Sequence, residues 1–358
     1  MLMTARRRDR IALLAMAGVV LVLNLVGWVV LIAVVAPQEY RVGGSGVFGV
    51  GLGVTAFLLG VRHAFDADHI AAIDNTARKL VGEGRPASGV GFWFSLGHSS
   101  VVFGLSLLLA VGVSALAGPV QNDDSTLQTT LGLVGTLTAG TFLIVIGLTN
   151  LSALFGIVHV FRHMRAGTFD EDKLEHHLHQ RGLMARLFNR ATRRVTKPRH
   201  LYPIGLLMGL GFDTATQVAL LVLAGGAAST LPWYAILVLP VLFAAGMTLF
   251  DTADGVFMAH AYKWAFLSPV RKVYYNLTVT TLSVVVALVI GGIVLLQLLA
   301  EQFHLAALSW ATRLDLQYVG YLLVGLFVVV WTISLLAWKL GRFEERIEIR
   351  HAESASPL

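Results

Sequence analysis

Cysteine is absent from the 358-residue chain, and charged residues make up only 13% of it. The lack of cysteine excludes disulfide bonds and any metal site built on thiolates. The low charge excludes an ordinary soluble domain, in which about 25% of residues are charged. The sequence also has no Walker-type glycine-rich loop, so nothing in it indicates ATP hydrolysis by this chain. Most of the chain is apolar instead, with 56% hydrophobic residues and a mean hydropathy of +0.73.

The apolar residues gather in runs long enough to cross a bilayer, which takes about 20 residues of helix. These runs predict an all-α, polytopic membrane protein with about eight transmembrane helices, at residues 11–35, 47–74, 91–117, 128–160, 202–224, 234–262, 275–300 and 317–340. The polar stretches divide the chain further. The predicted parts are 1–160 with helices one to four, a cytoplasmic loop rich in histidine and arginine at 161–200, 201–340 with helices five to eight, and a cytoplasmic tail at 341–358.

The distribution of lysine and arginine predicts the orientation, because cytoplasmic segments of membrane proteins hold an excess of both. With the N-terminus inside, all but three of the 27 basic residues lie in cytoplasmic segments, the exceptions being Arg41, Arg62 and Arg313. We therefore expect both termini in the cytoplasm and a prokaryotic cytoplasmic (inner) membrane as the location. The same asymmetry explains the pI of 9.7 without a nucleic-acid partner.

The first apolar run follows the basic stretch "RRRDR" and resembles a signal peptide at first sight. It is longer than the apolar core of a signal peptide, and no clear A-x-A cleavage site follows it. We interpret it as a retained first transmembrane helix.

Ionisable residues interrupt these apolar runs, although a charge inside a bilayer costs at least about 2.5–3.5 kcal/mol. Residues 62–75, "RHAFDADHIAAIDN", hold one arginine, two histidines and three aspartates. His98 lies in "LGHSS", Asp213 in "GLGFDTATQ", and both Asp251 and Asp254 in "GMTLFDTADG". The predicted membrane segments thus contain six carboxyl groups and one arginine. Either a divalent cation neutralises these carboxylates, or some of them are protonated.

Histidine combined with carboxylate indicates a borderline first-row metal, such as nickel, cobalt, zinc or manganese. A magnesium or calcium site built on oxygen has little use for imidazole, and copper(I) prefers sulfur. On a continuous helix, His63, Asp66 and His69 share one side, whereas Asp68 points elsewhere. Asp68 therefore has another partner, or the helix is irregular there. The candidate metal-binding residues are His63, Asp66, Asp68, His69, His98, Asp213, Asp251 and Asp254.

Structural roles are the alternative for several of these residues. Arg62 paired with Asp66 or Asp68 would be a packing device rather than part of a metal site. Asp74, near the predicted cytoplasmic end of helix two, is equally well explained as a solvated helix terminus. His98 taken alone is more typical of a histidine that forms hydrogen bonds between helices.

Two further patterns have competing explanations. The motif "FDADHI" at 65–70 is echoed by "FDTATQV" at 212–218 and "FDTADGV" at 250–256, which indicates either an internal repeat or a chance similarity. The histidines of "DEDKLEHHLHQ" at 170–180 would receive a metal leaving the membrane, but a solvated charged helix is the better explanation.

Four stretches, in this order, resemble the signatures of the nickel/cobalt transporter (NiCoT) family: "RHAFDADHI", "LGHSSVV", "LGFDTATQ" and "GMTLFDTADG". The first matches the family's H-x4-D-H signature through His63, Asp68 and His69. The resemblance covers most of the chain and implies eight helices, cytoplasmic termini and high-affinity uptake of Ni²⁺ or Co²⁺ by a single-chain secondary carrier. One residue departs from the pattern, because Gln217 stands where the family usually has glutamate. The departure puts affinity or proton coupling in doubt.

The expected function is therefore metal transport, with Ni²⁺ or Co²⁺ as the substrate and with no resident cofactor, ATPase subunit or enzymatic activity. An inside-negative membrane potential suffices as the driving force, because a divalent ion gains about 4.6 kcal/mol per 100 mV on entry. The two ions accept the same ligands, so the sequence leaves the choice between them open.

Two other functions compete with uptake. In a proton-coupled exporter of a divalent metal or a small organic cation, the same acids would bind protons. A membrane di-iron enzyme of the desaturase kind is suggested by "HAFDADH" and "HHLHQ". Such an enzyme needs more clustered histidines at the cytoplasmic face than this chain offers, so we disfavour it.

Overall fold

The computed structural model describes residues 2–42, 46–110, 126–165, 195–210, 231–265 and 269–314, with parts of 319–333. Nearly all of these residues are helical, which confirms the predicted all-α class. The longer helices are α1 (Leu2–Val29), α2 (Val50–Ala64), α3 (Ala67–Gly82), α4 (Val90–Ala110), α6 (Thr126–Arg165), α11 (Trp233–Ala265) and α12 (Pro269–Gln302). The shorter ones are α9 (Tyr202–Met208) and α13 (Ser309–Thr312).

Five helical stretches of the described residues are long and apolar enough to cross a membrane: Asp9–Gln38, Val90–Leu108, Gly132–Gly156, Trp233–Trp264 and Thr280–Gln302. The bent pair α2 and α3 is either a sixth, broken span or a re-entrant loop. The predicted helices at 202–224 and 317–340 lie largely outside the described residues, as do the tail and most of the loop at 161–200. The chain is thus a multi-pass membrane protein, and the described residues supply five or six of the eight predicted spans.

A short irregular segment connects the first two spans. α1 continues through a π-helical turn, Val30–Val35, into a 3-10 turn, Ala36–Gln38. Proline within this last turn removes a backbone donor and ends the helix. The strands β1 (Arg41–Val42) and β2 (Gly46–Val47) then pair antiparallel before α2 begins.

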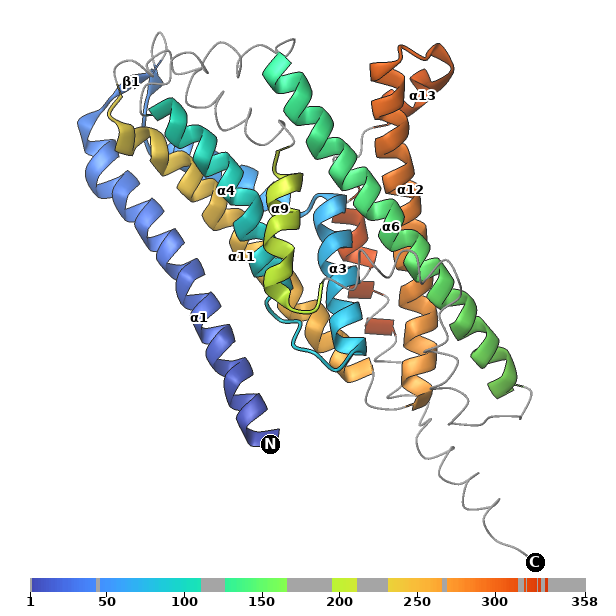
Figure 1. The fold of residues 1–358 in the computed structure, drawn as a ribbon. Helices are drawn as coiled ribbons and strands as arrows, with labels where there is room; N and C mark the ends of the chain where they lie inside the picture. Colours follow the sequence, from blue (N-terminus) through green and yellow to red (C-terminus); the bar gives the residue numbers. More distant parts are fainter. Residues whose placement is uncertain are drawn as a thin grey trace, which may run out of the picture.

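Helix α11 is the centre of the bundle and packs along α1, α2, α3 and α4, while α12 packs along α6 (Figure 1). Glycines permit the closest of these contacts. A Cβ atom at Gly91 of α4 would lie 1.7 Å from the backbone oxygen of Asp251, and one at Gly60 of α2 would lie 2.0 Å from that of Phe243. Without side chains at these points, α2 and α4 approach the backbone of α11. The contact places the functional side chains of three helices at one level.

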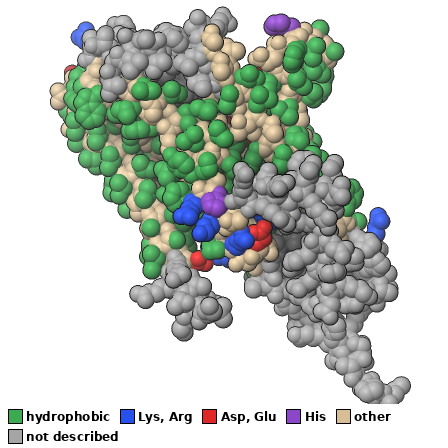
Figure 2. All heavy atoms as spheres, viewed as in Figure 1, with side chains coloured by type: hydrophobic (Ala, Val, Ile, Leu, Met, Phe, Trp, Pro, Cys, Tyr) green, Lys and Arg blue, Asp and Glu red, His purple; other side chains and the backbone are tan. Residues whose placement is uncertain are grey.

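Large apolar side chains cover much of the molecular surface. Leu14 and Leu21 of α1 are 72% and 58% exposed, and Phe155 of α6 is 68% exposed. Figure 2 shows hydrophobic side chains over most of the visible described surface, with lysine, arginine, aspartate and glutamate gathered toward the lower end. Such a surface fits lipid rather than water.

The predicted helix at 47–74 is wrong in one respect, because the structure breaks it in two. α2 ends at Ala64, α3 begins at Ala67, and the two axes differ in direction by 52°. Asp66 occupies the N-cap position of α3 with an extended backbone, but its carboxylate is bound to His63 and caps no backbone N–H. The second part also runs further than predicted, to Gly82.

Candidate metal centre

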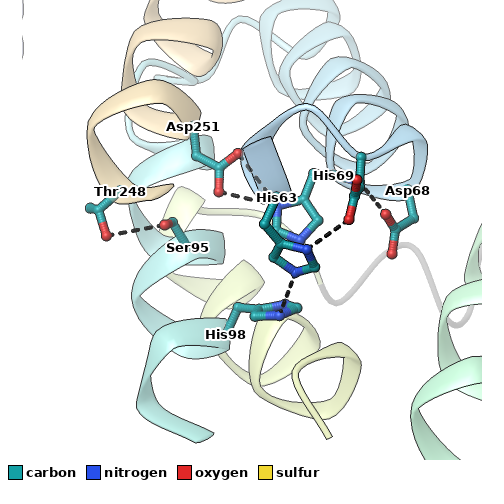
Figure 3. Close-up of polar contacts among 8 residues, drawn as sticks. His63, Asp68, His69, Ser95, His98, Thr248 and Asp251 are labelled. Carbon is teal, nitrogen blue, oxygen red and sulfur yellow. Dashed lines mark hydrogen bonds and ion pairs between the residues drawn. The ribbon is translucent and has the colours of Figure 1, made fainter. Parts of the chain in front are cut away.

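Three histidines from three helices meet beside the break between α2 and α3. His63 lies in the last turn of α2, His69 in the first turn of α3, and His98 in the middle of α4. Each offers a ring nitrogen, and these three atoms lie within 4.8 Å of one another. His69 is 0% and His98 3% exposed. The break in the helix brings His63 and His69 together, with ring centroids 4.6 Å apart (Figure 3).

A carboxylate behind His63 fixes the direction of its ring. Nδ1 of His63 lies 2.7 Å from Oδ2 of Asp66, so this nitrogen is turned away from the other two histidines. Nε2 of His63 faces His98 instead, 3.0 Å from its Nε2. The sequence prediction that His63 and Asp66 share one side is confirmed, although the helix ends between them.

A second carboxylate stands behind His69. Nδ1 of His69 lies 3.2 Å from Oδ2 of Asp251 on α11, and both side chains are fully buried. This leaves Nε2 of His69 buried without a hydrogen-bond partner among the residues that the structure describes. Ser95 of α4 interacts with the same carboxylate, and its hydroxyl donates to Thr248 Oγ1 at 3.1 Å. Carboxylate–histidine pairs of this kind set the tautomer of metal-binding histidines.

The spacing of the nitrogens suits a transition metal. Metal–imidazole bonds are about 2.0–2.1 Å long, so two nitrogens bound at roughly 90° lie about 3 Å apart. The 3.0 Å between Nε2 of His63 and Nε2 of His98 matches this separation. An ion at this place would also give buried Nε2 of His69 the partner that it lacks. Three imidazoles favour nickel, cobalt, zinc or copper(II) over magnesium and calcium.

The aspartates predicted from the sequence occupy different places. Asp66 and Asp251 stand behind histidines, as described above. Asp68 is partly exposed in the first turn of α3, where its Oδ1 accepts a hydrogen bond from the backbone N–H of His69. Asp254 lies one turn after Asp251 on α11, and its Oδ2 is buried without a partner. Asp213 lies outside the described residues.

Two expectations about helix two are wrong. Asp74 is not a solvated helix end, because it is fully buried in α3 and accepts hydrogen bonds from Tyr262 and Ser283. Arg78 does not lie in a cytoplasmic loop, because α3 continues to Gly82 and Arg78 is only 8% exposed. Both residues belong to a buried polar cluster that apolar periodicity alone does not reveal.

Sequence reasoning missed three residues around the histidines. Ser95 interacts with the carboxylate behind His69 and with Thr248, and Phe94 presents its ring edge-on to His69, with centroids 4.7 Å apart. Ser95 lies three residues before His98, the spacing of one helical turn, which is a local signal for a shared face. Thr248 lies three residues before Asp251 and Phe94 four residues before His98, so the same local signal was available for both.

Comparison with known proteins adds an independent finding. A family model described as "High-affinity nickel-transport protein" matches residues 49–337. Nickel transporter NicT of Mycobacterium tuberculosis is 56% identical over 334 residues, which cover 92% of this chain and 90% of that protein. Nickel transporter NixA of Staphylococcus aureus is 43% identical over 347 residues, or 96% and 99% of the two chains. Cobalt transport protein NhlF of Rhodococcus rhodochrous is 42% identical over 335 residues, or 92% and 93%. No solved structure matches the chain.

Proposed function

The chain belongs to the family of high-affinity nickel-transport proteins, and from this premise we propose that it carries Ni²⁺ or Co²⁺ into a prokaryotic cell. The observation that supports this proposal most directly is the cluster of His63, His69 and His98 inside an apolar bundle. The metal is the cargo and not a resident cofactor, and the protein performs no enzymatic step.

In the proposed site the three histidines bind the ion directly. Asp66 and Asp251 orient His63 and His69, so that the nitrogens opposite these carboxylates face the metal. The carboxylates also offset the positive charge that a divalent ion brings into a region of low dielectric constant. A dehydrated or partly hydrated ion therefore exchanges water for imidazole without leaving its charge uncompensated.

The remaining predicted carboxylates supply negative charge near this centre. Asp68 acts electrostatically on His69, and Asp254 acts on Asp251. Asp213 completes the predicted set from helix five. We assign these three residues to attracting the ion and to its passage, and not to the three-histidine cluster itself.

The proposed carrier is a single chain in the cytoplasmic membrane, with both termini in the cytoplasm and no ATPase subunit. The distribution of basic residues supports this orientation, because nearly all of them fall on one side. The membrane potential drives entry, at about 4.6 kcal/mol per 100 mV for a divalent ion. We retain the division of the chain into residues 1–160, 161–200, 201–340 and 341–358 as part of this proposal.

Uptake of radiolabelled nickel and cobalt, each with the other as competitor, tests the proposal in cells that express the protein. We expect saturable uptake by the wild type and loss of at least about 90% of it in His63→Ala and His98→Ala, because each variant removes one of three metal-binding nitrogens. His260→Ala is the matched control, since this histidine lies on α11 but is exposed. It should transport like the wild type.

Two outcomes would overturn the assignment. Normal uptake by both His63→Ala and His98→Ala would show that the cluster is not the transport site. Absence of uptake by the wild type, together with proton-dependent efflux measured in inverted vesicles, would favour export of a divalent metal or a small organic cation.

A further inference from the structure

A second buried polar cluster lies along α3, beyond the metal centre. α3 contributes an aspartate, an asparagine and an arginine, and three neighbouring helices contribute their partners. We call this cluster the inner junction; its members are Asp74, Asn75 and Arg78 of α3, Asn150 of α6, Tyr262 of α11, and Thr280 and Ser283 of α12.

Asp74 connects α3 to two other helices at once. Its Oδ2 accepts a hydrogen bond of 2.7 Å from Ser283 Oγ on α12, and its Oδ1 accepts one from the Tyr262 hydroxyl on α11. Arg78 donates to Thr280 Oγ1 on α12 and, at 3.2 Å, to Oδ1 of Asn75. Asp74 therefore holds α11 and α12 against α3, and Arg78, one turn later, forms a second link to α12.

Asn75 extends the inner junction to α6. Its Oδ1 accepts a hydrogen bond from Nδ2 of Asn150, and its own Nδ2 donates a hydrogen bond of 2.7 Å to the backbone oxygen of Ala71. Two sets of hydrogen bonds thus join α3 to the other three helices, one centred on Asp74 and one on Asn75 and Arg78, and Arg78 also acts electrostatically on Asp74. A polar network inside a membrane bundle is costly to keep, and such networks usually mark a functional path.

The inner junction lies on the predicted cytoplasmic side of the metal centre. His69 is in the first turn of α3, and Asp74 follows five residues later, about 7.5 Å along the axis. The helix then continues to Lys79 and Gly82, toward the end of the molecule where charged side chains gather in Figure 2. An ion released inward from the histidines would have to pass this level.

The helices around the inner junction fall into two groups. α2, α3 and α4 carry the three histidines, and α2 and α4 each contact α11 through glycine, at Gly60, Gly246 and Gly91. α6 and α12 form a separate tight pair, in which Gly140 and Gly147 face leucine side chains of α12. Figure 1 shows this pair on the far side of α3 from α4 and α11. α3, which carries His69, therefore lies between α4 and α11 on one side and the α6–α12 pair on the other.

We propose that the inner junction is the cytoplasmic gate of the carrier. It is closed in this structure, and it opens when the α6–α12 pair separates from α3 and α11. The proposal rests on the transport function and the orientation proposed above. Its members suit a contact that is made and broken repeatedly, because hydroxyl, amide and carboxylate groups that separate are hydrated by the water entering an open path. An apolar contact of equal area would expose hydrophobic surface each time.

Cross-linking across the inner junction tests the gate directly, because the chain contains no native cysteine. The test variant is Asn75→Cys with Asn150→Cys, bridged by a short bifunctional methanethiosulfonate reagent in the purified, liposome-reconstituted protein. We expect cross-linking to reduce Ni²⁺ uptake at least tenfold, a reductant to restore it, and Ni²⁺ binding to persist. The bridge would hold α3 to α6 and keep the gate closed while the histidines remain available.

The matched control places a bridge inside the α6–α12 pair. A Cβ atom at Gly140 would lie 2.8 Å from Cγ of Leu295, so Gly140→Cys with Leu295→Cys sets two thiols close together and removes the obstructing leucine. Uptake should continue after cross-linking, because this pair moves as one body. Unchanged uptake by the cross-linked Asn75/Asn150 variant would overturn the gate.

A labelling measurement decides the question if the paired variant fails to transport before cross-linking. Asn150→Cys alone is reacted with a membrane-impermeant thiol reagent from the cytoplasmic side, with and without Tyr262→Phe and Ser283→Ala. These substitutions delete both hydroxyls that bind Asp74 while changing side-chain size little. We expect labelling several-fold faster in the combined variant, and an equal rate would contradict the gate. Failure of the wild type to take up Ni²⁺ or Co²⁺ would instead overturn the proposed function.

Discussion

Asp251 acts on the proposed metal through His69, without reaching the three-histidine cluster itself. Its carboxylate lies 3.2 Å from Nδ1 of His69, on the side of the ring opposite the cluster. A proton held between these two atoms leaves Nε2 of His69 unprotonated, and only an unprotonated nitrogen binds a metal. Ser95 in turn interacts with this carboxylate and with Thr248. We therefore regard Asp251 as a positioning residue.

Asp251→Asn tests this role with little change in side-chain size. The amide retains one oxygen but loses the charge that makes His69 a stronger ligand, so we expect Ni²⁺ affinity to fall about 10–100-fold. Calorimetric titration of the purified protein with Ni²⁺ measures the loss. Thr248→Val removes a hydroxyl that contacts Ser95 and not Asp251 itself, so Ni²⁺ affinity should fall less in this variant. Equal affinity in Asp251→Asn and the wild type would exclude the positioning role.

The sequence predicts the residues of the site better than it predicts their roles. The cost of burying ionisable groups made His63, His69, His98 and Asp251 candidates together with four further aspartates, because ionisable groups inside apolar runs usually have a function. Their roles depend on contacts between distant segments, such as His69 with Asp251, which are 182 residues apart. The same limit explains the error over Asp74, whose partners lie on helices that no local pattern connects to it.

The break between α2 and α3 is the element that creates the metal centre. In a straight helix, His63 and His69 would be separated by about 9 Å of rise, whereas the bend of 52° brings their ring centroids to 4.6 Å. The sequence offers an irregular helix only as one alternative, because no proline marks the break and the apolar periodicity continues across it. Tertiary contacts of Phe65 with Phe250 and Tyr321 occupy the break itself.

The contact between α4 and α11 positions His98 relative to Asp251, and it depends on Gly91. Gly91→Ala would place a Cβ atom 1.7 Å from a backbone oxygen that has no rotamer by which to move away. We expect overpacking of this kind to cost about 1–3 kcal/mol and to lower the melting temperature of the purified protein by several degrees.

Gly104→Ala is the matched control for this prediction. Gly104 belongs to the same helix, but a Cβ atom there would meet nothing within 4 Å. Alanine also favours helix over glycine by up to about 1 kcal/mol, so this variant should melt at or slightly above the wild-type temperature. An unchanged or raised melting temperature in Gly91→Ala, as in Gly104→Ala, would show that the contact of α4 with α11 does not require glycine at residue 91.

At the scale of the whole molecule, two of the three echoed motifs meet at the metal centre. Phe65 and Phe250 begin the motifs at 65–70 and 250–256, and their rings lie 5.4 Å apart. His69 of the first motif contacts Asp251 of the second. The third motif, at 212–218, lies outside the described residues. An internal repeat stays a prediction, but its matched segments occupy the place where transporter repeats usually form a substrate site.

The arrangement of charges also leads us to expect membrane potential as the energy source. The motif of helix five has Gln217 where the nickel/cobalt transporter family usually has glutamate, so this chain has one proton-binding group fewer. Neutralisation of the buried carboxylates then falls to the metal itself. Transport that moves the two charges of the ion, without a compensating proton, responds to membrane potential alone.

Uptake into liposomes that contain the purified protein and no ATP distinguishes potential-driven entry from proton coupling. With a potassium gradient and valinomycin setting the voltage, we expect the equilibrium accumulation of Ni²⁺ to rise about tenfold for each 30 mV or so, since a divalent ion gains about 4.6 kcal/mol per 100 mV. Removing a pH gradient at constant voltage should leave the accumulation unchanged. If accumulation instead follows the pH gradient and ignores the voltage, protons balance the metal charge, and the buried carboxylates beside the three histidines carry them.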